Sequence, residues 1–386
     1  MEKRMRLSDK WKAPALFHFQ RLRICLEERE KMNTVIMWLM AFGAVLGGLD
    51  RILGNRFGLG KRFEEGFELL GATALSMAGI ICLVPLLTLL LEKTVVPFWN
   101  FLGLDPAMLG GIIAIDMGGF QLAGELAADP KAASYAGLLV AATLGCTVTF
   151  TIPVGMGMVP EEDRPLFARG ILAGLMMLPV SLFIGGLLTG LTPLNTIRQS
   201  LPVFLACFVL AFGISRWPEQ LVRGFLHFAN AIRFLSTLGL ILGAFIYMTD
   251  VRAPFPMTPL SEAMKTVSSI GIVMLGSLPM AELLQRLLKV PLTWLGKKTG
   301  MNSASMTGLL LGSVSVVPAI ALIREMDRRG KIVNAAFLVC AASALAAHLG
   351  FTFGVQKEMV VPLLAVKFLG GLLGGAAAYG MTGKTK

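Results

Sequence analysis

Charged residues are scarce in this sequence. They make up 15% of its 386 residues, against about 25% in an ordinary soluble domain. Hydrophobic residues make up 55%, and apolar runs of roughly 20 residues, long enough to cross a bilayer, recur from Met32 to the C-terminus. The runs are continuous, which excludes the alternating strands of a barrel and predicts helices, whose backbone groups pair within each segment. The composition therefore predicts an all-α polytopic membrane protein.

Signatures of enzymes and cofactor sites are also missing. The sequence contains no GxxxxGK(S/T), HExxH or GxSxG motif, and its five cysteines are scattered singly, without paired spacing. We therefore expect no catalytic residue, no metal site and no cofactor. Without a nucleotide site, uphill transport would need an ion gradient, and facilitated diffusion is equally open.

The basic residues point to a membrane surface rather than to nucleic acid. The net charge is +11, but Lys and Arg gather in short clusters between the apolar runs, as juxtamembrane residues do. Residues 1–31 differ from the rest, with nine Lys or Arg, five acids and no run of spanning length. They are either an amphipathic surface helix or an over-extended gene start, with translation beginning at Met32.

The remaining chain divides into a first helix and two longer parts. We expect the first transmembrane helix and its connector over residues 32–62, a first transmembrane half over residues 63–249 and a second over residues 260–381. Together they hold about 10 or 11 transmembrane helices, one or two of which are broken or re-entrant.

An internal similarity relates the two halves. Residues 103–113 align with residues 300–310 at a constant offset of 197, which places Asp116 on Ser313. Segments interrupted by Gly or Pro at matching positions of two halves mark the central binding site of many transporters. The sequence therefore predicts broken or re-entrant helices near the midplane, with a substrate site between them.

Asp116 is the leading candidate for that site. An ionised carboxylate within the bilayer costs about 2.5–3.5 kcal/mol, so such acids usually line a cavity or have a partner. Asp116 would serve as the counter-ion of a cationic substrate or as a proton carrier, and a structural hydrogen bond at the helix break is the alternative. The neighbouring Gly118 and Gly119 favour a ligand role, because they leave room for a close approach.

Five further residues complete the predicted substrate site: Phe120, Gln121, Ser313, Ser315 and His348. Phe120 could offer its ring face to an ammonium group, or it could pack as a buried aromatic. His348 is the histidine inside an apolar run, where it could relay protons or bond a hydroxyl, and a satisfied core histidine is equally compatible.

Three acids stand at the start of the apolar run that begins at Leu69. Glu64, Glu65 and Glu68 suit a solvated helix start, since carboxylates favour a helix N-terminus. Ion binding or gating is the functional alternative for these residues.

Five short strings occur in order along the chain: DRIL at residues 50–53, FEEGF at residues 63–67, DMGGF at residues 116–120, MDRRGK at residues 326–331 and HLGF at residues 348–351. Together they resemble the bacterial ethanolamine-utilisation membrane permease family, over residues 32–381. The resemblance implies a multi-pass inner-membrane carrier that supplies ethanolamine to a cobalamin-dependent ammonia-lyase, often housed in a protein microcompartment. Members tend to carry two amide residues where Ser315 and Val316 stand, and an acid where Ala347 stands. The second half-site of this chain is therefore less polar, and the substrate could differ.

The resemblance implies a small protonated amine as the substrate. Ethanolamine is a primary amine, protonated at neutral pH much as lysine is with its pKa of about 10. Asp116 would pair with its ammonium group, and Ser315, Gln121 or His348 would bond its hydroxyl. A carrier for another small amine or amino acid would share these features, and a membrane-embedded enzyme or a non-transporting membrane protein is the remaining alternative. The expected partners are ethanolamine and the lipid bilayer, with a homo-oligomer left open and no nucleic acid.

Overall fold

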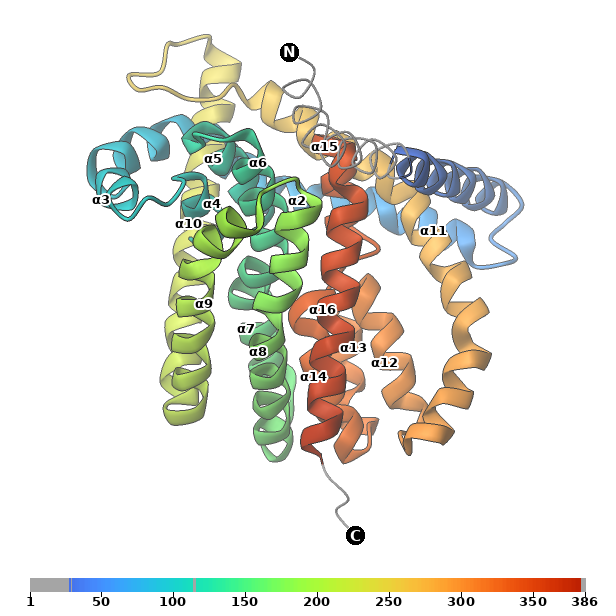
Figure 1. The fold of residues 1–386 in the computed structure, drawn as a ribbon. Coiled ribbons are helices and arrows are strands. Elements are labelled where there is room, and N and C mark those ends of the chain that lie inside the picture. The colour runs from blue at the N-terminus through green and yellow to red at the C-terminus, as the bar shows by residue number, and fades with distance from the viewer. Residues whose placement is uncertain (1–27, 29, 114–115, 383–386) are drawn as a thin grey trace, which may run out of the picture.

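The computed structural model describes residues 28, 30–113 and 116–382, and every regular element in this part of the chain is a helix (Figure 1). The long helices are Glu30–Ile52, α2 (Leu59–Thr94), α8 (Arg164–Leu188), α9 (Pro193–Arg216), α10 (Pro218–Thr249), α11 (Leu260–Thr299) and α16 (Val360–Met381). The shorter α-helices are α3 (Val96–Phe101), α4 (Ala107–Ile112), α5 (Gly119–Leu126), α6 (Pro130–Ser134), α7 (Ile152–Met158), α12 (Ser303–Val314), α13 (Val316–Ala321), α14 (Arg328–Ala341) and α15 (Ala347–Gln356). The π-helical elements are η2 (Tyr135–Gly145) and η3 (Thr147–Thr151), and the 3-10 turns are η1 (Asp116–Gly118), η4 (Glu161–Asp163), η5 (Leu322–Glu325) and η6 (Lys357–Met359).

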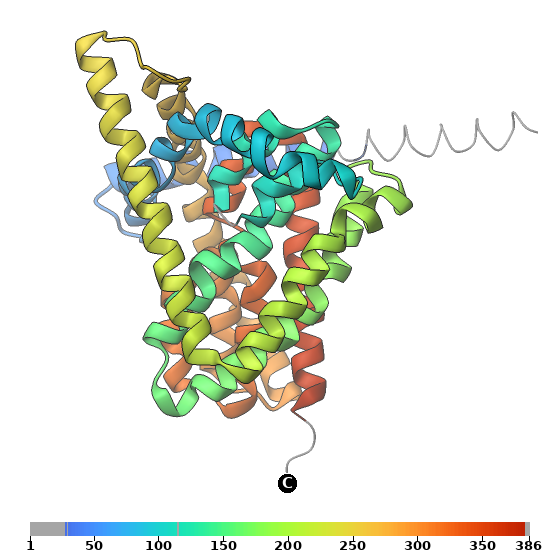
Figure 2. The ribbon, with the colours of Figure 1, turned by 90° about the vertical axis from the view of Figure 1, so that its left-hand side faces the viewer.

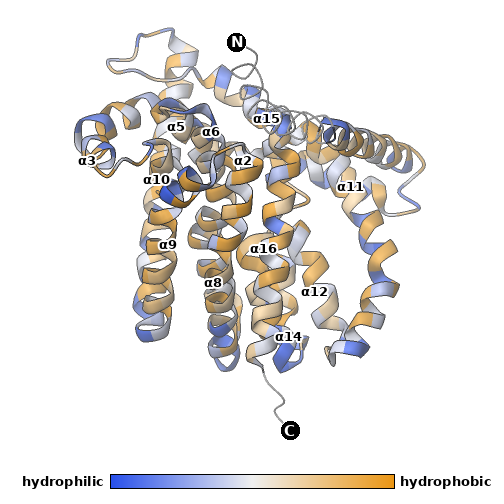
Figure 3. Ribbon diagram, in the orientation of Figure 1, coloured by the Kyte–Doolittle hydropathy of each residue, from blue (hydrophilic) through white to orange (hydrophobic). Residues whose placement is uncertain are grey.

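Within the described residues, eight helical segments are long and apolar enough to cross a membrane. Seven contain the long helices above, and the eighth, Pro130–Met158, runs from α6 through η2 and η3 to α7. Hydrophobic residues dominate these segments, whereas hydrophilic residues gather mainly near their ends and in the connections (Figure 3). The chain is therefore an all-α, multi-pass membrane protein, as predicted. The basic extension predicted over residues 1–31 falls almost entirely outside the described residues.

Small residues let the central helices approach closely. An added Cβ at Gly374 of α16 would lie 3.2 Å from the Cα of Gly174 in α8. Toward the end of α16, Nη2 of Arg169 donates to the carbonyl of Met381 at 2.7 Å. Close glycine contacts of this kind replace the hydrophobic driving force that lipid does not supply. The two contacts also show that α8 and α16 run antiparallel.

The helices α2 and α11 form a second antiparallel pair. Nε of Arg62 lies 3.1 Å from Oε2 of Glu282, and further along α2 an added Cβ at Gly66 would collide with the backbone of Met274. Since residue numbers rise along α2 while they fall along α11, the two helices point in opposite directions.

Residues 105–129 form a first hairpin, made of α4, η1 and α5, that turns back instead of crossing the bundle. The buried carboxylate of Asp105 joins its two ends. It accepts hydrogen bonds from the N–H groups of Ala107 at 2.9 Å, Ala128 at 3.3 Å and Asp129 at 2.9 Å. The hairpin lies at the end of the bundle opposite the C-terminus (Figures 1 and 2).

The two arms of this first hairpin are in direct backbone contact. An added Cβ on Gly110 or on Gly119 would collide with the backbone of the other arm, so both positions require glycine. Asp116 thus lies at the turn of a hairpin, between α4 and α5. Asp116 opens η1, and its side chain lies outside the described part of the structure.

Residues 302–327 form a second hairpin, made of α12, α13 and η5. Asn302 joins its ends, because its N–H donates to Oδ1 of Asp327 at 2.9 Å and its Nδ2 donates to the carbonyl of Glu325 at 2.8 Å. Burial raises the pKa of Asp327, but hydrogen bonds from Ser305 and Asn302 outweigh it, so the pKa lies below the ordinary value of 3.8.

The second hairpin opens at the same end of the bundle as the end of α16. The hydroxyl of Tyr379 donates to the carbonyl of Thr299 at 3.3 Å, and Nε of Arg329 donates to Oγ1 of Thr382 at 3.2 Å. The two hairpins therefore enter the bundle from opposite ends (Figure 1).

Two apolar segments of the second half are interrupted. Ser315, whose backbone is extended (φ −150°, ψ 134°), separates α12 from α13. Residues 342–346 separate α14 from α15.

Candidate functional site

The unwound segment between α14 and α15 lies against the turn of the second hairpin. The N–H of Ser343 donates to the carbonyl of Gly312 at 3.0 Å, and the N–H of Leu345 donates to the carbonyl of Ser313 at 2.8 Å. Both acceptors belong to the last turn of α12, whose carbonyls have no helical partners because the helix ends there. Two interrupted segments thus satisfy each other's backbone groups.

The carbonyls at the end of α14 are bonded by side chains from other elements. Oγ1 of Thr147 in η3 donates to the carbonyl of Val339 at 2.8 Å. Nζ of Lys367 in α16 donates to the carbonyls of Cys340 at 3.1 Å and Ala342 at 2.8 Å. The break in α14 is therefore held by specific polar contacts, as buried backbone groups require.

Lys367 is fully buried, with 0% of its surface exposed. Besides α14, it reaches the π-helix η2, where its Nζ donates to the carbonyl of Ala142 at 2.7 Å. Our sequence analysis missed this residue. The available signal was its position as a lone lysine in the last apolar run, because an ionisable residue inside a membrane span is a functional candidate by default.

An aromatic pair connects the first hairpin to α15. The rings of Phe120 and Phe351 meet edge to face, with centroids 5.9 Å apart and planes at 85°. Phe120 also packs closely on η2, since an added Cβ at Gly137 would fall 2.7 Å from its Cα. The predicted aromatic is therefore held between two elements of the site.

Gln121 follows Phe120 and presents a free acceptor. Its Oε1 is buried and has no hydrogen-bond partner among the described residues. Buried polar atoms are nearly always hydrogen-bonded, so an unpaired amide oxygen here is a natural acceptor for a polar solute. Oγ1 of Thr151 in η3 is likewise buried and has no hydrogen-bond partner among the described residues, so it could also bond a polar solute.

The predicted residues of the second half gather around the same unwound segment. His348 is buried, with 2% exposed, and its backbone N–H donates to the carbonyl of Ser343 at 3.3 Å. Ser313 borders the segment through its carbonyl, and its own Oγ donates to the carbonyl of Leu310 at 2.7 Å. Phe351, one turn beyond His348, completes the connection to the first hairpin. The structure thus brings Phe120, Ser313 and His348 into one contiguous cluster.

A cavity of about 550 Å³ borders the turn of the first hairpin. Its walls include Met117 and Gly118 of η1, Thr149 of η3, and residues of α2 and α10. The cavity therefore gives a small solute room beside the predicted site.

The three predicted acids at the start of α2 are engaged elsewhere or exposed. Oε1 of Glu64 lies 2.7 Å from Nε of Arg51, and Oε2 of Glu65 lies 2.8 Å from Nη1 of Arg62. Glu68 is exposed. Arg62 also bonds Glu282 of α11, so Glu65 belongs to an ion-pair network between α2 and α11.

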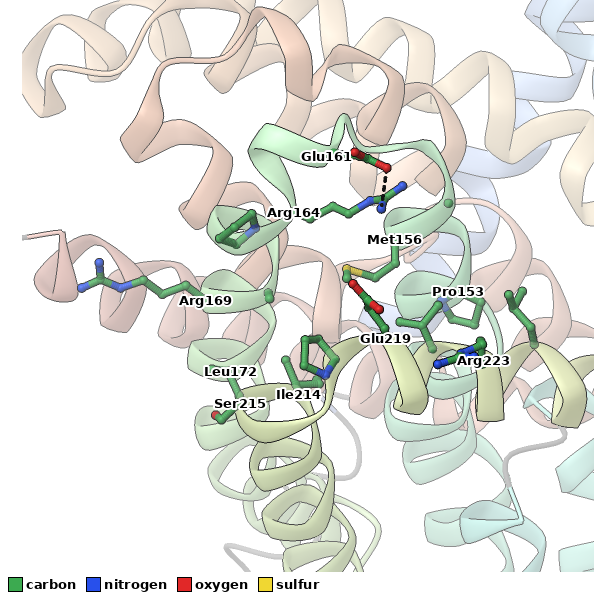
Figure 4. A pocket seen from close by; sticks show the side chains of 16 residues that line it. Pro153, Met156, Glu161, Arg164, Arg169, Leu172, Ile214, Ser215, Glu219 and Arg223 are labelled. Atoms are coloured by element: carbon green, nitrogen blue, oxygen red, sulfur yellow. Dashed lines mark ion pairs between the residues drawn. The ribbon is translucent and has the colours of Figure 1, made fainter.

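A larger cavity, of about 820 Å³, lies between α7, α8 and the turn from α9 to α10. Figure 4 shows Arg164 beside Glu161 at its edge, with Glu219 and Arg223 contributed by α10. Nη1 of Arg164 lies 3.5 Å from Oε1 of Glu161, and both side chains of this ion pair are exposed. None of the predicted site residues lines this cavity.

No group of three or more His, Cys, Asp or Glu residues in the described part of the chain is placed to hold a metal ion. The buried polar atoms of the site that lack a partner among the described residues are instead an amide oxygen, Oε1 of Gln121, and a hydroxyl, Oγ1 of Thr151. Such groups suit a small polar solute with hydrogen-bond donors.

Comparison with known proteins identifies similar chains. A family model described as "Ethanolamine utilisation protein, EutH" matches residues 32–381. A protein of Listeria monocytogenes named "Probable ethanolamine permease EutH" is 37% identical over 342 residues, which cover 88% of this chain and 92% of the relative. A protein of Escherichia coli with the same name is 33% identical, covering 88% of this chain and 93% of the relative. An uncharacterized protein of Bacillus subtilis, YxeR, is 36% identical, and the match covers 91% of this chain and 95% of the relative. No solved structure matches the chain.

Proposed function

The chain belongs to the EutH family of ethanolamine utilisation proteins, which are permeases rather than enzymes, and from this premise we propose that it carries ethanolamine across a bacterial membrane. The carrier binds the protonated amine between the two hairpin turns and moves it without ATP. The unpaired Oε1 of Gln121, buried at the turn of the first hairpin, is the observation that carries this proposal.

The chemistry of the substrate explains why a carrier is needed. The amine of ethanolamine is protonated at neutral pH, since its pKa is close to the value of about 10 for lysine. A charged ammonium group crosses hydrocarbon poorly, so uptake of scarce amine or uptake from an acidic medium depends on a protein route. A site that binds the charged form requires a counter-ion and acceptors for the ammonium and hydroxyl protons.

We assign those roles to residues of the cluster. Asp116 is the counter-ion of the ammonium group, and the ring of Phe120, already fixed against Phe351, provides a face for the same cation. Gln121 accepts a hydrogen bond through its free Oε1, and His348 or Ser315 bonds the hydroxyl. Gly118 and Gly119 keep side-chain bulk away from the approach to Asp116.

The first experiment compares uptake of labelled ethanolamine into proteoliposomes by the wild type and by Asp116→Asn, at acidic external pH. The control is Glu125→Gln, which removes an exposed carboxylate from the same hairpin. We expect Asp116→Asn to abolish uptake while its level in the vesicles stays normal, and Glu125→Gln to retain it. Unchanged uptake by Asp116→Asn would refute the counter-ion role.

Competition by unlabelled amines then defines the substrate class. If ethanolamine is the substrate, a molar excess of it should suppress uptake more than amines that lack the hydroxyl, because the acceptor of that hydroxyl would be left unpaired. If wild type moves another small amine but not ethanolamine, the carrier remains and the substrate must be reassigned, with Ser315 and Val316 as the first positions to examine.

A further inference from the structure

We propose that Lys367 is a tethered cation: its ammonium group occupies a carbonyl-lined site between the broken end of α14 and the π-helix η2, a site that a free monovalent cation of similar size would otherwise fill. What this site means for ion coupling during transport rests on the proposed carrier function, whereas the existence of the cation site does not depend on that function.

The geometry of the site is that of a cation held by backbone oxygens. The carbonyls of Ala142, Cys340 and Ala342 accept from Nζ at 2.7, 3.1 and 2.8 Å. One belongs to the π-helix η2 and two to the end of α14, so the ammonium group bridges segments that are far apart in the sequence. Distances in this range suit an ammonium or a potassium ion, which carbonyl oxygens bind in place of water.

The electrostatics of the site favour a cation. The end of α14 carries the partial negative charge of a helix C-terminus, and its last carbonyls have no partners within the helix. Lys367 is 0% exposed, and a buried charge is tolerated only where it is paired or hydrogen-bonded. The lysine and the helix ends therefore stabilise each other.

Carriers built on broken helices commonly bind their coupling ions at such carbonyls. Here the chain itself supplies the cation, on a side chain that cannot leave. We therefore infer that no inorganic cation has to bind at this crossing when ethanolamine is moved, and that removing the ammonium group exposes a vacant site for one.

The test compares two substitutions of Lys367 in purified protein. Lys367→Ala removes the charge and leaves space beside the three carbonyls, whereas Lys367→Met removes the charge but fills most of that space. The melting temperatures of both variants and of the wild type are measured in the chlorides of potassium, ammonium, sodium and N-methyl-D-glucamine at equal ionic strength.

We expect only Lys367→Ala to distinguish the cations. Its melting temperature should rise by about 3 °C in potassium or ammonium chloride relative to N-methyl-D-glucamine chloride, the shift for a chain of this size at roughly 100 times the dissociation constant. The wild type and Lys367→Met should show no such difference. Equal melting temperatures of Lys367→Ala in all four salts would overturn the proposal, as would recovery of no folded Lys367→Ala in any of them.

The wild type offers a second, independent measurement. Its ethanolamine uptake should be the same in potassium, sodium and N-methyl-D-glucamine media, and a several-fold stimulation by one cation together with stabilisation by that cation would overturn the proposal. Because the melting experiment contains no ethanolamine, its outcome separates failure of the cation site from failure of the proposed transport function.

Discussion

Replacing Asp105 with Asn should loosen the first hairpin without unfolding the bundle. The carboxylate receives three backbone N–H groups, from Ala107, Ala128 and Asp129. An asparagine at this position keeps one oxygen but turns an NH₂ group toward a backbone N–H, so one acceptor becomes a donor. The bonds that remain also lose their charge.

The magnitude follows from the lost contact. A hydrogen bond to a charged group contributes about 1.5–3 kcal/mol, and a buried donor left unpaired costs a comparable amount. Asp105 is 8% exposed, so water compensates little of this loss. We therefore expect the closed hairpin to lose about 2 kcal/mol relative to its locally open form, which is roughly a 30-fold increase in opening.

Amide hydrogen exchange detects this opening directly. Exchange of the N–H groups of Ala128 and Asp129 in Asp105→Asn should be faster by this factor, while a peptide from the second hairpin, residues 302–327, exchanges as in the wild type. The control is Asp129→Asn, because Asn caps a helix about as well as Asp and the backbone N–H of residue 129 is retained.

Two outcomes would contradict the reasoning. Exchange at Ala128 and Asp129 within threefold of the wild type would show that Asp105 does not hold the hairpin closed. An equal acceleration in residues 302–327 would show a global rather than a local effect. Ethanolamine uptake measured on the same samples then reports how far hairpin closure matters for transport.

Two further predictions concern stability. The pKa of Asp327 is lowered in the folded protein, so the carboxylate stabilises the fold above pH 3.8 and loses this effect as the pH falls through the lowered pKa. The difference in melting temperature between wild type and Asp327→Asn should therefore shrink below that pH. A difference that stays constant with pH would exclude the carboxylate as the source of the stabilisation. An added Cβ at Gly79 would overlap the backbone oxygen of Ser236, whereas one at Gly71 would meet nothing within 4 Å. Gly79→Ala should therefore lower the free energy of unfolding by about 1–3 kcal/mol and lower the melting temperature, while Gly71→Ala should not. Equal melting temperatures of the two variants would contradict this close packing of α2 on α10.

The sequence predicted the helical class and the position of the first break, and both have simple physical causes. Apolar runs without alternation admit only helices in lipid. The glycine pair at residues 118 and 119 marked the turn of the first hairpin because glycine permits the close approach of two backbones. The second hairpin was harder to recognise, because the residue that separates α12 from α13 is Ser315 and not a glycine.

The polar contacts at the centre could not be predicted from local pattern. Thr147 and the carbonyl it bonds are 192 residues apart, and Lys367 and the carbonyl of Ala142 are 225 residues apart. Within one segment, Oγ1 of Thr149 bonds the carbonyl of Gly145 in its own helix, whereas Oγ1 of Thr147 bonds a carbonyl of α14. Such pairings depend on which elements the fold places together, and this information is absent from any one segment.

The internal similarity at an offset of 197 gains support from backbone geometry. Gly103 and Gly300 both have positive φ, 65° and 70°, a region that favours glycine. Two residues further on, Asp105 and Asn302 each use a side-chain oxygen to bond the start of the next helix and each joins the ends of a hairpin. The helices that precede the hairpins, α2 and α11, are antiparallel neighbours, and so are α8 and α16, which follow them. From these parallels we propose that the two halves are related and that they lie in opposite orientation. In that arrangement the hairpins enter from opposite ends, and a solute bound between their turns, as we propose, would be separated from each side of the membrane by one hairpin. Alternating access would then require movement of only one hairpin at a time. The carboxylate and the amide that close the hairpins, Asp105 and Asn302, would be the positions at which each hairpin can be loosened separately.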